Sequence, residues 1–159
     1  MVATDLFARR ATLSRSLRLL SAFRFEQSDP DRFYGALADD TVAMVGDLWR
    51  SATGSTTEGV TLVDVGGGPG YFASAFTDAG VRYIGVEPDP TEMHAAAPRS
   101  HRRAGSFVRA SGTALPFADD SVDLCLSSNV AEHVREPWLL GDEMRRVTRP
   151  GGLVVLSYT

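Results

Sequence analysis

Residues 63–72 read VDVGGGPGYF and place four glycines within five positions, directly after an apolar run. Glycine destabilises regular helices and strands by about 0.5–1 kcal/mol, so this density indicates a backbone loop held close to another group. A glycine-rich loop between a strand and a helix presents backbone N–H groups to a polar ligand. The candidate ligands are a nucleoside triphosphate, a dinucleotide and another nucleoside cofactor, and a tight turn without a ligand is the simplest alternative.

The residues around the loop argue against the first two ligands. A P-loop ends in Gly-Lys-Ser/Thr, and this chain contains no lysine, which also excludes lysine nucleophiles and bases. The dinucleotide pattern G-x-G-x-x-G, counted from Gly66, needs its third glycine where Tyr71 stands. A nicotinamide oxidoreductase is therefore a weaker alternative, and a turn alone does not explain four glycines.

Polar residues also follow two other apolar segments. Glu87 comes directly after the segment 81–86, 21 residues after Gly66. In Rossmann-like folds an acid about 20 residues beyond the loop binds the ribose hydroxyls, and the alternative is an acid favoured by a helix N-terminus. His133 lies beyond the segment 122–127, and a histidine there can titrate near neutral pH.

The elements that position these residues alternate along the chain. Apolar segments predict strands, the stretches between them predict helices, and a small polar stretch at 51–59 precedes them. The strands are expected at 60–65, 81–86, 106–110, 122–127 and 153–158, and the helices at 70–79, 90–97 and 137–148. Such alternation predicts an α/β fold, with a Rossmann-like, open, mostly parallel sheet and helices on both faces. The loop, Glu87 and the residues after 127 then gather at one edge of the sheet.

Helices are also predicted before this sheet domain, at 31–50 and within residues 1–25. The second of these segments carries five arginines against one acid, with leucines at helical spacing. It is expected either to lie on the domain or on a partner chain, or to touch an anionic lipid surface as a peripheral membrane contact. We divide the chain into an N-terminal helical extension, 1–55, and a sheet domain, 56–159.

Composition limits the class of protein. A chain of 159 residues with 43% apolar and 23% charged residues fits a globular domain. Its net charge of −4 argues against a dedicated nucleic-acid-binding protein, and no metal site is predicted. Cys125 is the single cysteine, so no intrachain disulfide can form. With no secretory segment and no apolar run near roughly 18 residues, we expect a cytoplasmic protein.

The pattern D-x-G-x-G-x-G, formed by Asp64, Gly66, Gly68 and Gly70, resembles the motif of class I S-adenosylmethionine-dependent methyltransferases. Glu87, the L-P-F segment at 115–117 and the RVTRPGG segment at 146–152 extend the resemblance over about residues 60–158. The family usually has an aspartate where Ser111 stands. In the family this aspartate contacts the adenine amino group of the cofactor. Here the Ser111 hydroxyl or the Gly112 amide would have to make that contact.

The resemblance implies S-adenosyl-L-methionine as the cofactor, with Asp64 near its ammonium group and Glu87 at its ribose. The implied cofactor-binding residues are Asp64, Gly66, Gly67, Gly68, Gly70, Glu87, Pro88, Ser111, Gly112, Thr113, Ser128 and Asn129. Methyl transfer from a sulfonium requires alignment and exclusion of water more than covalent catalysis. If a general base is needed, the catalytic candidates are His133 and Asn129, and the alternative is that His133 only solvates a loop.

The resemblance also indicates the class of molecule that accepts the methyl group. The segment SSNV at 127–130 lacks the Asn/Asp-Pro-Pro-aromatic motif of amino-methylating enzymes, which with the acidic composition favours a small-molecule or lipid-like acceptor. The pattern is closest to the quinone-biosynthesis-type branch, which includes many uncharacterised methyltransferases. Transfer to O, N or C stays open.

The family fold has further strands after the fifth, which is the last one this sequence predicts. We therefore expect the C-terminal strands of the fold to be missing, and the segment 153–158 to present an apolar edge for self-association or a partner chain. The alternative to an active enzyme is an inactive or fragmentary cofactor-binding module that needs a partner chain.

Overall fold

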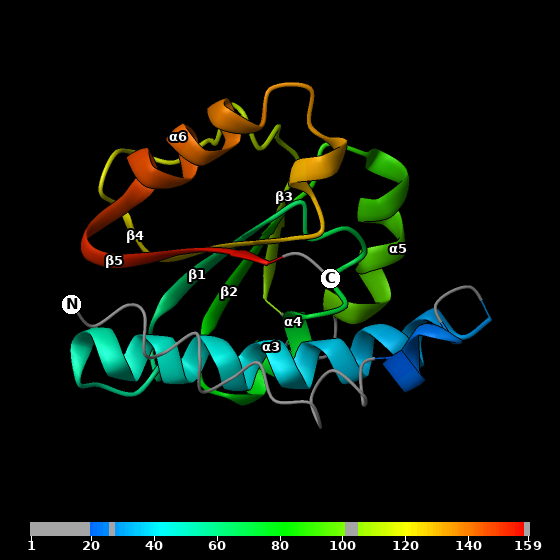
Figure 1. Ribbon diagram of the computed structural model, residues 1–159. Coiled ribbons are helices and arrows are strands. Elements are labelled where there is room, and N and C mark those ends of the chain that lie inside the picture. The colour runs from blue at the N-terminus through cyan, green and yellow to red at the C-terminus, as the bar shows by residue number, and fades with distance from the viewer. Residues whose placement is uncertain (1–19, 26–27, 101–104, 158–159) are drawn as a thin grey trace.

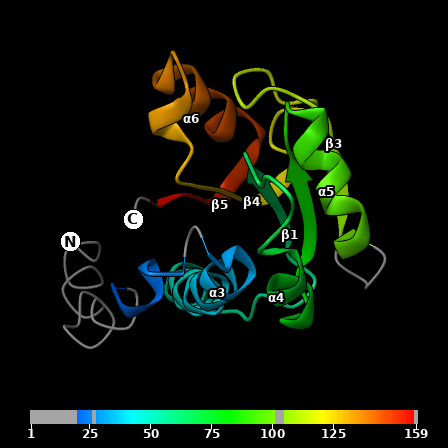
Figure 2. The same ribbon diagram turned by 90° about the vertical axis from the view of Figure 1, so that its right-hand side faces the viewer.

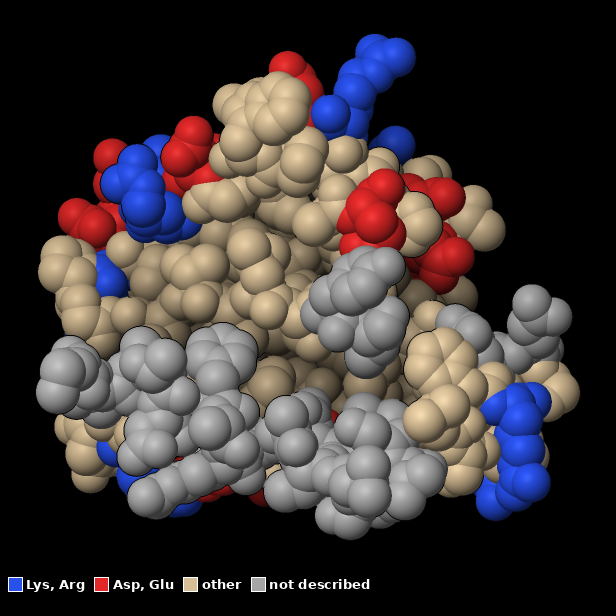
Figure 3. Space-filling model, in the orientation of Figure 1, with Lys and Arg blue, Asp and Glu red and all other residues tan. Residues whose placement is uncertain are grey.

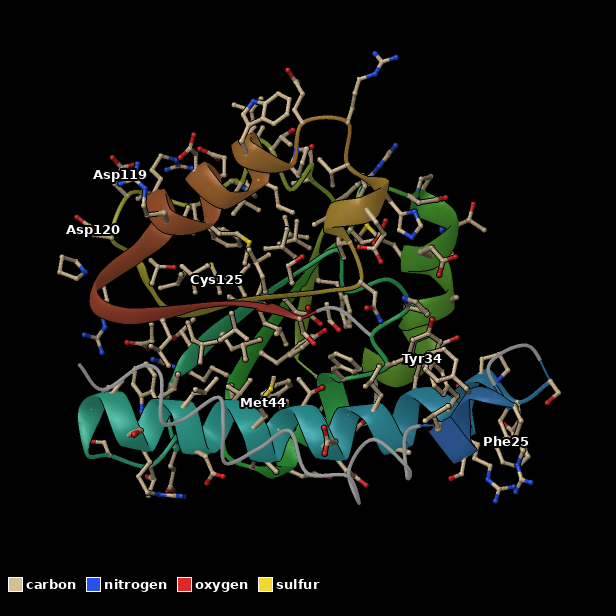
Figure 4. The ribbon with its side chains drawn as sticks, in the orientation of Figure 1. Phe25, Tyr34, Met44, Asp119, Asp120 and Cys125 are labelled. Carbon is tan, nitrogen blue, oxygen red and sulfur yellow. The ribbon has the colours of Figure 1, made fainter. Side chains whose placement is uncertain are left out.

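The computed structural model describes residues 20–25, 28–100 and 105–157 (Figure 1). Most of the predicted amphipathic segment 1–25 thus lies outside the described residues. Its described end exposes Leu20 and Phe23, by 65% and 42%. The guanidinium groups of Arg24 and Arg32 lie over the ring of Phe25, at 4.7 and 3.9 Å from its centroid (Figure 4).

Five parallel strands form one sheet in the order β3-β2-β1-β4-β5. Their bounds are Thr61–Val65 for β1, Arg82–Val86 for β2, Ser106–Val108 for β3, Val122–Ser128 for β4 and Thr148–Ser157 for β5. The predicted open parallel sheet is confirmed. The chain runs outward from β1 through β2 to β3 and then crosses to β4 on the other side of β1. The topological switch point therefore lies between β1 and β4, where open α/β sheets bind ligands.

Helices cover both faces of this sheet, as Figure 2 shows for α3 and α4 on one side and α6 on the other. The helices are α3 at Pro30–Thr53, α4 at Ala73–Asp78, α5 at Pro90–Ser100 and α6 at Pro137–Val147, with a short 3-10 turn, η1, at Ala131–His133. None of the helices in the described ranges is long and apolar enough to cross a bilayer.

Two apolar cores separate the layers, and the alternation of side chains along β1 supplies both of them. Leu62 packs in one core with Trp49 of α3 and Phe76 of α4. Val63 faces the opposite way and packs with Met144 of α6. The described helix of the N-terminal extension therefore shares a core with the sheet.

Side-chain caps fix where two of the helices begin. The Asp29 carboxylate accepts a hydrogen bond from the Arg32 N–H at 3.2 Å at the start of α3, which ends at Gly54 in the left-handed conformation. At the start of α5 the Asp89 carboxylate accepts from the Thr91 N–H at 2.7 Å. Hydrogen bonds from Thr91 lower the pKa of Asp89. The two helices begin at Pro30 and Pro90, within one residue of the predicted starts, and aspartate is among the preferred N-cap residues.

β5 begins earlier than the sequence predicts, directly after α6 rather than at residue 153. Thr148 pairs with Val122, and the register then shifts before regular pairing resumes. Gly152 makes this irregularity possible, because an added Cβ would lie 2.4 Å from the Asp123 carbonyl oxygen. Apolar patterning alone does not reveal strand residues of this kind.

β5 is an edge strand in the described part of the chain, since it pairs with β4 alone. Val155 is buried, whereas Val154 and Leu156 expose 41% and 58% of their surface. In Figure 3 the surface over β5 is mostly uncharged and the charged side chains gather at its margins. The predicted apolar edge is present, and its role in association stays a prediction.

Candidate functional site

The glycine loop lies at the carboxyl end of β1, beside the switch point of the sheet. Gly66 and Gly67 both donate their N–H groups to the Val86 carbonyl, at 2.8 and 3.2 Å, and Gly70 donates to the Gly67 carbonyl at 2.9 Å. These backbone hydrogen bonds fix the loop to the end of β2.

The glycines of this loop serve different purposes. Gly66 has φ +76, and an added Cβ would lie 2.5 Å from a methyl group of Val130. At Gly70 an added Cβ would lie 2.5 Å from the ring of Phe107, so Gly70 packs against the protein. Gly68, with φ +51, has open space at that position. The predicted close approach of a ligand is therefore possible at Gly68, while Gly70 lines neither of the cavities described next.

Two cavities flank the loop and share Gly66. The first, of about 140 Å³, is lined by Tyr34, Asp64, Gly66, Gly67, Gly68, Pro69, Tyr71, Phe72, Ser128 and Asn129. The second, of about 280 Å³, is lined by Val65, Gly66, Pro88, Ser111, Gly112, Thr113, Val130, His133, Val134, Arg135 and Glu136. Five segments that are distant in the sequence thus meet at one edge of the sheet, as the parallel topology predicts.

Asp64 lies in the wall of the first cavity and is only 3% exposed. The Tyr83 hydroxyl donates a hydrogen bond to Asp64 Oδ2 at 2.6 Å. Burial raises the pKa of Asp64 to about 6; the hydrogen bond from Tyr83 opposes this shift, and the negative charge of Glu87 adds to it. Among the described residues Asp64 has no cationic partner, and a buried carboxylate of this kind is suited to a positively charged ligand group.

Glu87 follows β2 and connects the glycine loop to the turn before α5. Its Oε2 accepts a hydrogen bond from the Gly68 N–H at 3.1 Å, and its Oε1 accepts from the Asp89 N–H at 3.0 Å. Each carboxylate oxygen has a second lone pair. Glu87 can therefore hold the loop and still accept hydrogen bonds from a ligand.

The end of β4 completes the first cavity. The Ser128 hydroxyl is buried and has no hydrogen-bond partner among the residues that the structure describes. Leaving such a group unpaired costs about 1–3 kcal/mol, which points to a polar ligand group in this cavity. Asn129 follows with φ +55 and donates its N–H to the Ser157 carbonyl at 3.0 Å. This left-handed backbone is uncommon outside glycine and turns the chain across the cavity.

A compact turn at 111–114 forms one side of the second cavity. The hydroxyl oxygens of Ser111 and Thr113 lie 2.9 Å apart, and the Thr113 N–H donates to Ser111 Oγ at 3.2 Å. Gly112 packs so closely that an added Cβ would lie 2.8 Å from side chains of both Val65 and Leu140. Two hydroxyl groups are thereby presented at this cavity.

Arg146 of α6 holds the segment that follows this turn. Its guanidinium donates to the carbonyls of Leu115 and Phe117, at 3.0 and 2.9 Å, and to the Asp119 carboxylate at 2.7 Å. Glu143 pairs with the same guanidinium at 2.6 and 2.8 Å, and this hydrogen bonding lowers the pKa of Glu143. The L-P-F segment is therefore anchored on α6, with Asp119 at the outer end of the network (Figure 4).

The two catalytic candidates lie in different places. Asn129 lines the first cavity, together with Asp64. His133 is exposed in η1 and lines the second cavity with Pro88 and Thr113. The structure therefore does not bring them together, and the catalytic roles of both remain predictions.

Sequence analysis missed an aromatic pair at the first cavity. Tyr34 of α3, labelled in Figure 4, stacks on Tyr71, with ring centroids 4.3 Å apart and an angle of 10° between the ring planes. Tyr71 directly follows the glycine loop in the sequence, and this position indicates that its side chain lies near the candidate site. Tyr34 gave no such signal, because its place at the cavity depends on how α3 packs across the sheet.

Comparisons with known proteins agree with this geometry. Residues 63–156 match the family described as "Methyltransferase domain". An uncharacterized methyltransferase of Mycolicibacterium gilvum is 82% identical over the whole chain, which spans 62% of that relative's length. Two solved structures have similar folds. The YcgJ protein of Bacillus subtilis is 26% identical with a TM-score of 0.60, and the match covers 70% of this chain and 48% of that one. The [4+2]-cyclase SpnF is 25% identical with a TM-score of 0.61, and the match covers 70% of this chain and 43% of that one. The chain belongs to the methyltransferase domain family.

Proposed function

We propose that this chain carries the cofactor site of an S-adenosyl-L-methionine-dependent methyltransferase that acts on a small-molecule or lipid-like acceptor. The observation that carries the proposal is Asp64, a buried carboxylate in the wall of a cavity beside the glycine loop. Phosphate ligands would be repelled at this position, whereas the ammonium group of an amino-acid-bearing nucleoside would be attracted.

The residues present fit such a cofactor. Asp64 and the unpartnered hydroxyl of Ser128 supply a carboxylate and a hydrogen-bonding group for the amino-acid part. Glu87 keeps lone pairs for ribose hydroxyls, and the hydroxyls of Ser111 and Thr113 suit a base edge. The open side of Gly68 allows close approach of the backbone.

When bound, S-adenosyl-L-methionine supplies an activated methyl group on a sulfonium. The chain's own residues would then orient and enclose it. Asp64 and Glu87 hold the two ends of the site at a fixed separation, because both extend from paired strands. The stacked rings of Tyr34 and Tyr71 keep water from one side of the first cavity. Alignment and exclusion of water are the main requirements of such a displacement.

The lining of the first cavity supports the acceptor class. Tyr34, Pro69, Tyr71 and Phe72 give it an apolar and aromatic wall, which suits a small apolar or lipid-like molecule. A net charge of −4 does not favour a nucleic-acid acceptor. We further propose a cytoplasmic protein, because its one cysteine, Cys125, is buried as a free thiol.

A lipid surface is one proposed partner of the N-terminal segment. The exposed Leu20 and Phe23 and the stacked Arg24 and Arg32 combine apolar and cationic groups, as interfacial segments do. Flotation with anionic and with neutral vesicles tests this proposal. Binding to the anionic vesicles alone supports it, and recovery of the protein free of both would refute it.

Calorimetric titration with S-adenosyl-L-methionine tests the main proposal. We expect binding by the unaltered chain, much weaker binding by Glu87→Ala, and unchanged binding by the control Asp142→Ala, whose side chain is 67% exposed on α6. Equal behaviour of Glu87→Ala and the control would argue against the assigned site. Because SpnF has a similar fold and is a cyclase, methyl transfer needs its own assay, with labelled cofactor against quinol and lipid extracts.

A further inference from the structure

A buried acid and a buried tyrosine face each other across β1 and β2. The Tyr83 hydroxyl lies 2.6 Å from Asp64 Oδ2, and the two residues are 2% and 3% exposed. The ring centroids of Phe76 and Phe107 lie 6.3 and 6.0 Å from the ring centroid of Tyr83. The tyrosine is thus held in a packed aromatic cluster, and its hydroxyl fixes one oxygen of the carboxylate.

The glycine loop lies directly over this pair. An added Cβ at Gly67 would lie 3.0 Å from the Tyr83 hydroxyl and 3.1 Å from Asp64 Oδ2. The carboxylate is therefore enclosed by β1, β2 and the loop, and it forms part of the wall of the first cavity.

Within the described part of the chain, the groups that face Asp64 carry no positive charge. From β2 and the turn after it come the Tyr83 hydroxyl and the Glu87 carboxylate; from α3 comes Tyr34, and from β4 the neutral Ser128 and Asn129. Among the described residues, Tyr83 and Glu87 are the side chains that shift the pKa of Asp64, and neither carries a positive charge. A cation that enters this cavity would be the first close partner of opposite charge.

We propose that Asp64, positioned by Tyr83, is a proton-linked anchor for the cationic amino-acid end of the cofactor. In acidic solution Asp64 binds a proton while the cavity holds no cation, and it releases that proton to solvent when an ammonium group enters. Tyr83 is the positioning residue, because its hydrogen bond keeps one oxygen oriented and leaves the carboxylate group at the cavity wall. The inference rests on the proposed function and deepens it.

The direction in which ligand binding depends on pH follows from the raised pKa of Asp64. Burial raises the pKa of Asp64 to about 6, and a bound cation lowers it again. Binding therefore weakens as the pH falls through 6, because a proton must first leave. For a pKa near 6 the dissociation constant should be about tenfold larger at pH 5 than at pH 7, and nearly constant above pH 7.

The experiment is calorimetric titration of the full chain with S-adenosylhomocysteine, which keeps the ammonium group. Measurements in two buffers of different ionisation enthalpy give the number of protons released. At pH 5.5 we expect about three-quarters of a proton, and at pH 7 about one tenth, for a pKa near 6. Adenosine, which lacks the ammonium, should bind without releasing protons.

Three variants separate the roles of the residues. Asp64→Asn should abolish proton release, and the matched control Asp142→Asn, at an exposed carboxylate of α6, should leave it unchanged. Tyr83→Phe keeps the ring and removes the hydrogen bond, so the midpoint of the pH dependence should rise by about one unit. A purely structural role of Tyr83 would lower the unfolding temperature and leave that midpoint in place.

The outcomes are distinguishable. Binding of S-adenosylhomocysteine that is independent of pH, or proton release that persists in Asp64→Asn, would overturn the proton-linked anchor and leave the proposed function standing. No binding at any pH between 5 and 8 would overturn the proposed function and the inference with it.

Discussion

Tyr34 of α3 lies parallel to Tyr71 of the glycine loop, with ring centroids 4.3 Å apart, and both rings line the first cavity. The contact joins a helix that precedes the sheet to the loop that follows β1. The N-terminal helix therefore forms part of the candidate site as well as part of the core. Any ligand of Asp64 lies within reach of this aromatic wall.

Removal of one ring should weaken ligand binding. An aromatic pair contributes about 0.5–1.5 kcal/mol beyond its buried area, so Tyr34→Ala should raise the dissociation constant of S-adenosylhomocysteine by about threefold to tenfold. Tyr34→Phe keeps the stacked ring and should bind as the unaltered chain does. Calorimetry measures both variants, and equal affinity of Tyr34→Ala and Tyr34→Phe would show that the stack does not support the site.

The sequence predicted the features that depend on local patterns. The strands of the sheet, Asp64 and Glu87 were recognisable because apolar runs and motif spacing are read along the chain. Tyr34 and Tyr83 were missed, because their roles come from packing between elements that are distant in the sequence. The early start of β5 was missed for a related reason, since its first residues are mostly polar or glycine residues without an apolar pattern.

Alanine at two loop glycines should lower the stability of the chain to different extents. Gly66→Ala combines φ +76 with an added Cβ 2.5 Å from Val130, so we expect a loss of about 2–4 kcal/mol in the free energy of unfolding. Gly68→Ala meets open space, so it should lose only about 1 kcal/mol of stability but weaken ligand binding. Urea unfolding and calorimetry on both variants measure the two quantities, and an equal loss of stability would contradict this assignment.

The two neighbouring arginines of α6 provide a matched pair for the Arg146 network. Arg146→Lys removes the forked geometry that serves two carbonyls and two carboxylates, and we expect a loss of about 1–3 kcal/mol in the free energy of unfolding. Arg145→Lys should be neutral, since the Arg145 side chain is 79% exposed and lies 4.0 Å from Asp142. Urea unfolding of both variants tests this, and similar midpoints would mean that the network contributes little.

Cys125 should be protected from thiol reagents in the folded chain. Its side chain is buried in β4, and burial raises the pKa of the thiol to about 11. Only a thiolate reacts quickly, so at pH 8 we expect slow modification by a disulfide reagent and rapid modification in denaturant. Rapid modification without denaturant would show that the α6 side of the sheet opens easily.

The edge of β5 should make this 159-residue chain self-associate. Val154 and Leu156 are exposed beside unpaired backbone groups, which is the arrangement that favours strand-to-strand pairing between molecules. Leu156→Lys places a charge on this edge and should shift the sedimentation profile toward the monomer. Leu139→Lys is the control, because Leu139 is exposed by 37% but lies on α6. If both variants sediment like the unaltered chain, the edge does not mediate association; if Leu139→Lys alone dissociates it, the interface lies on α6.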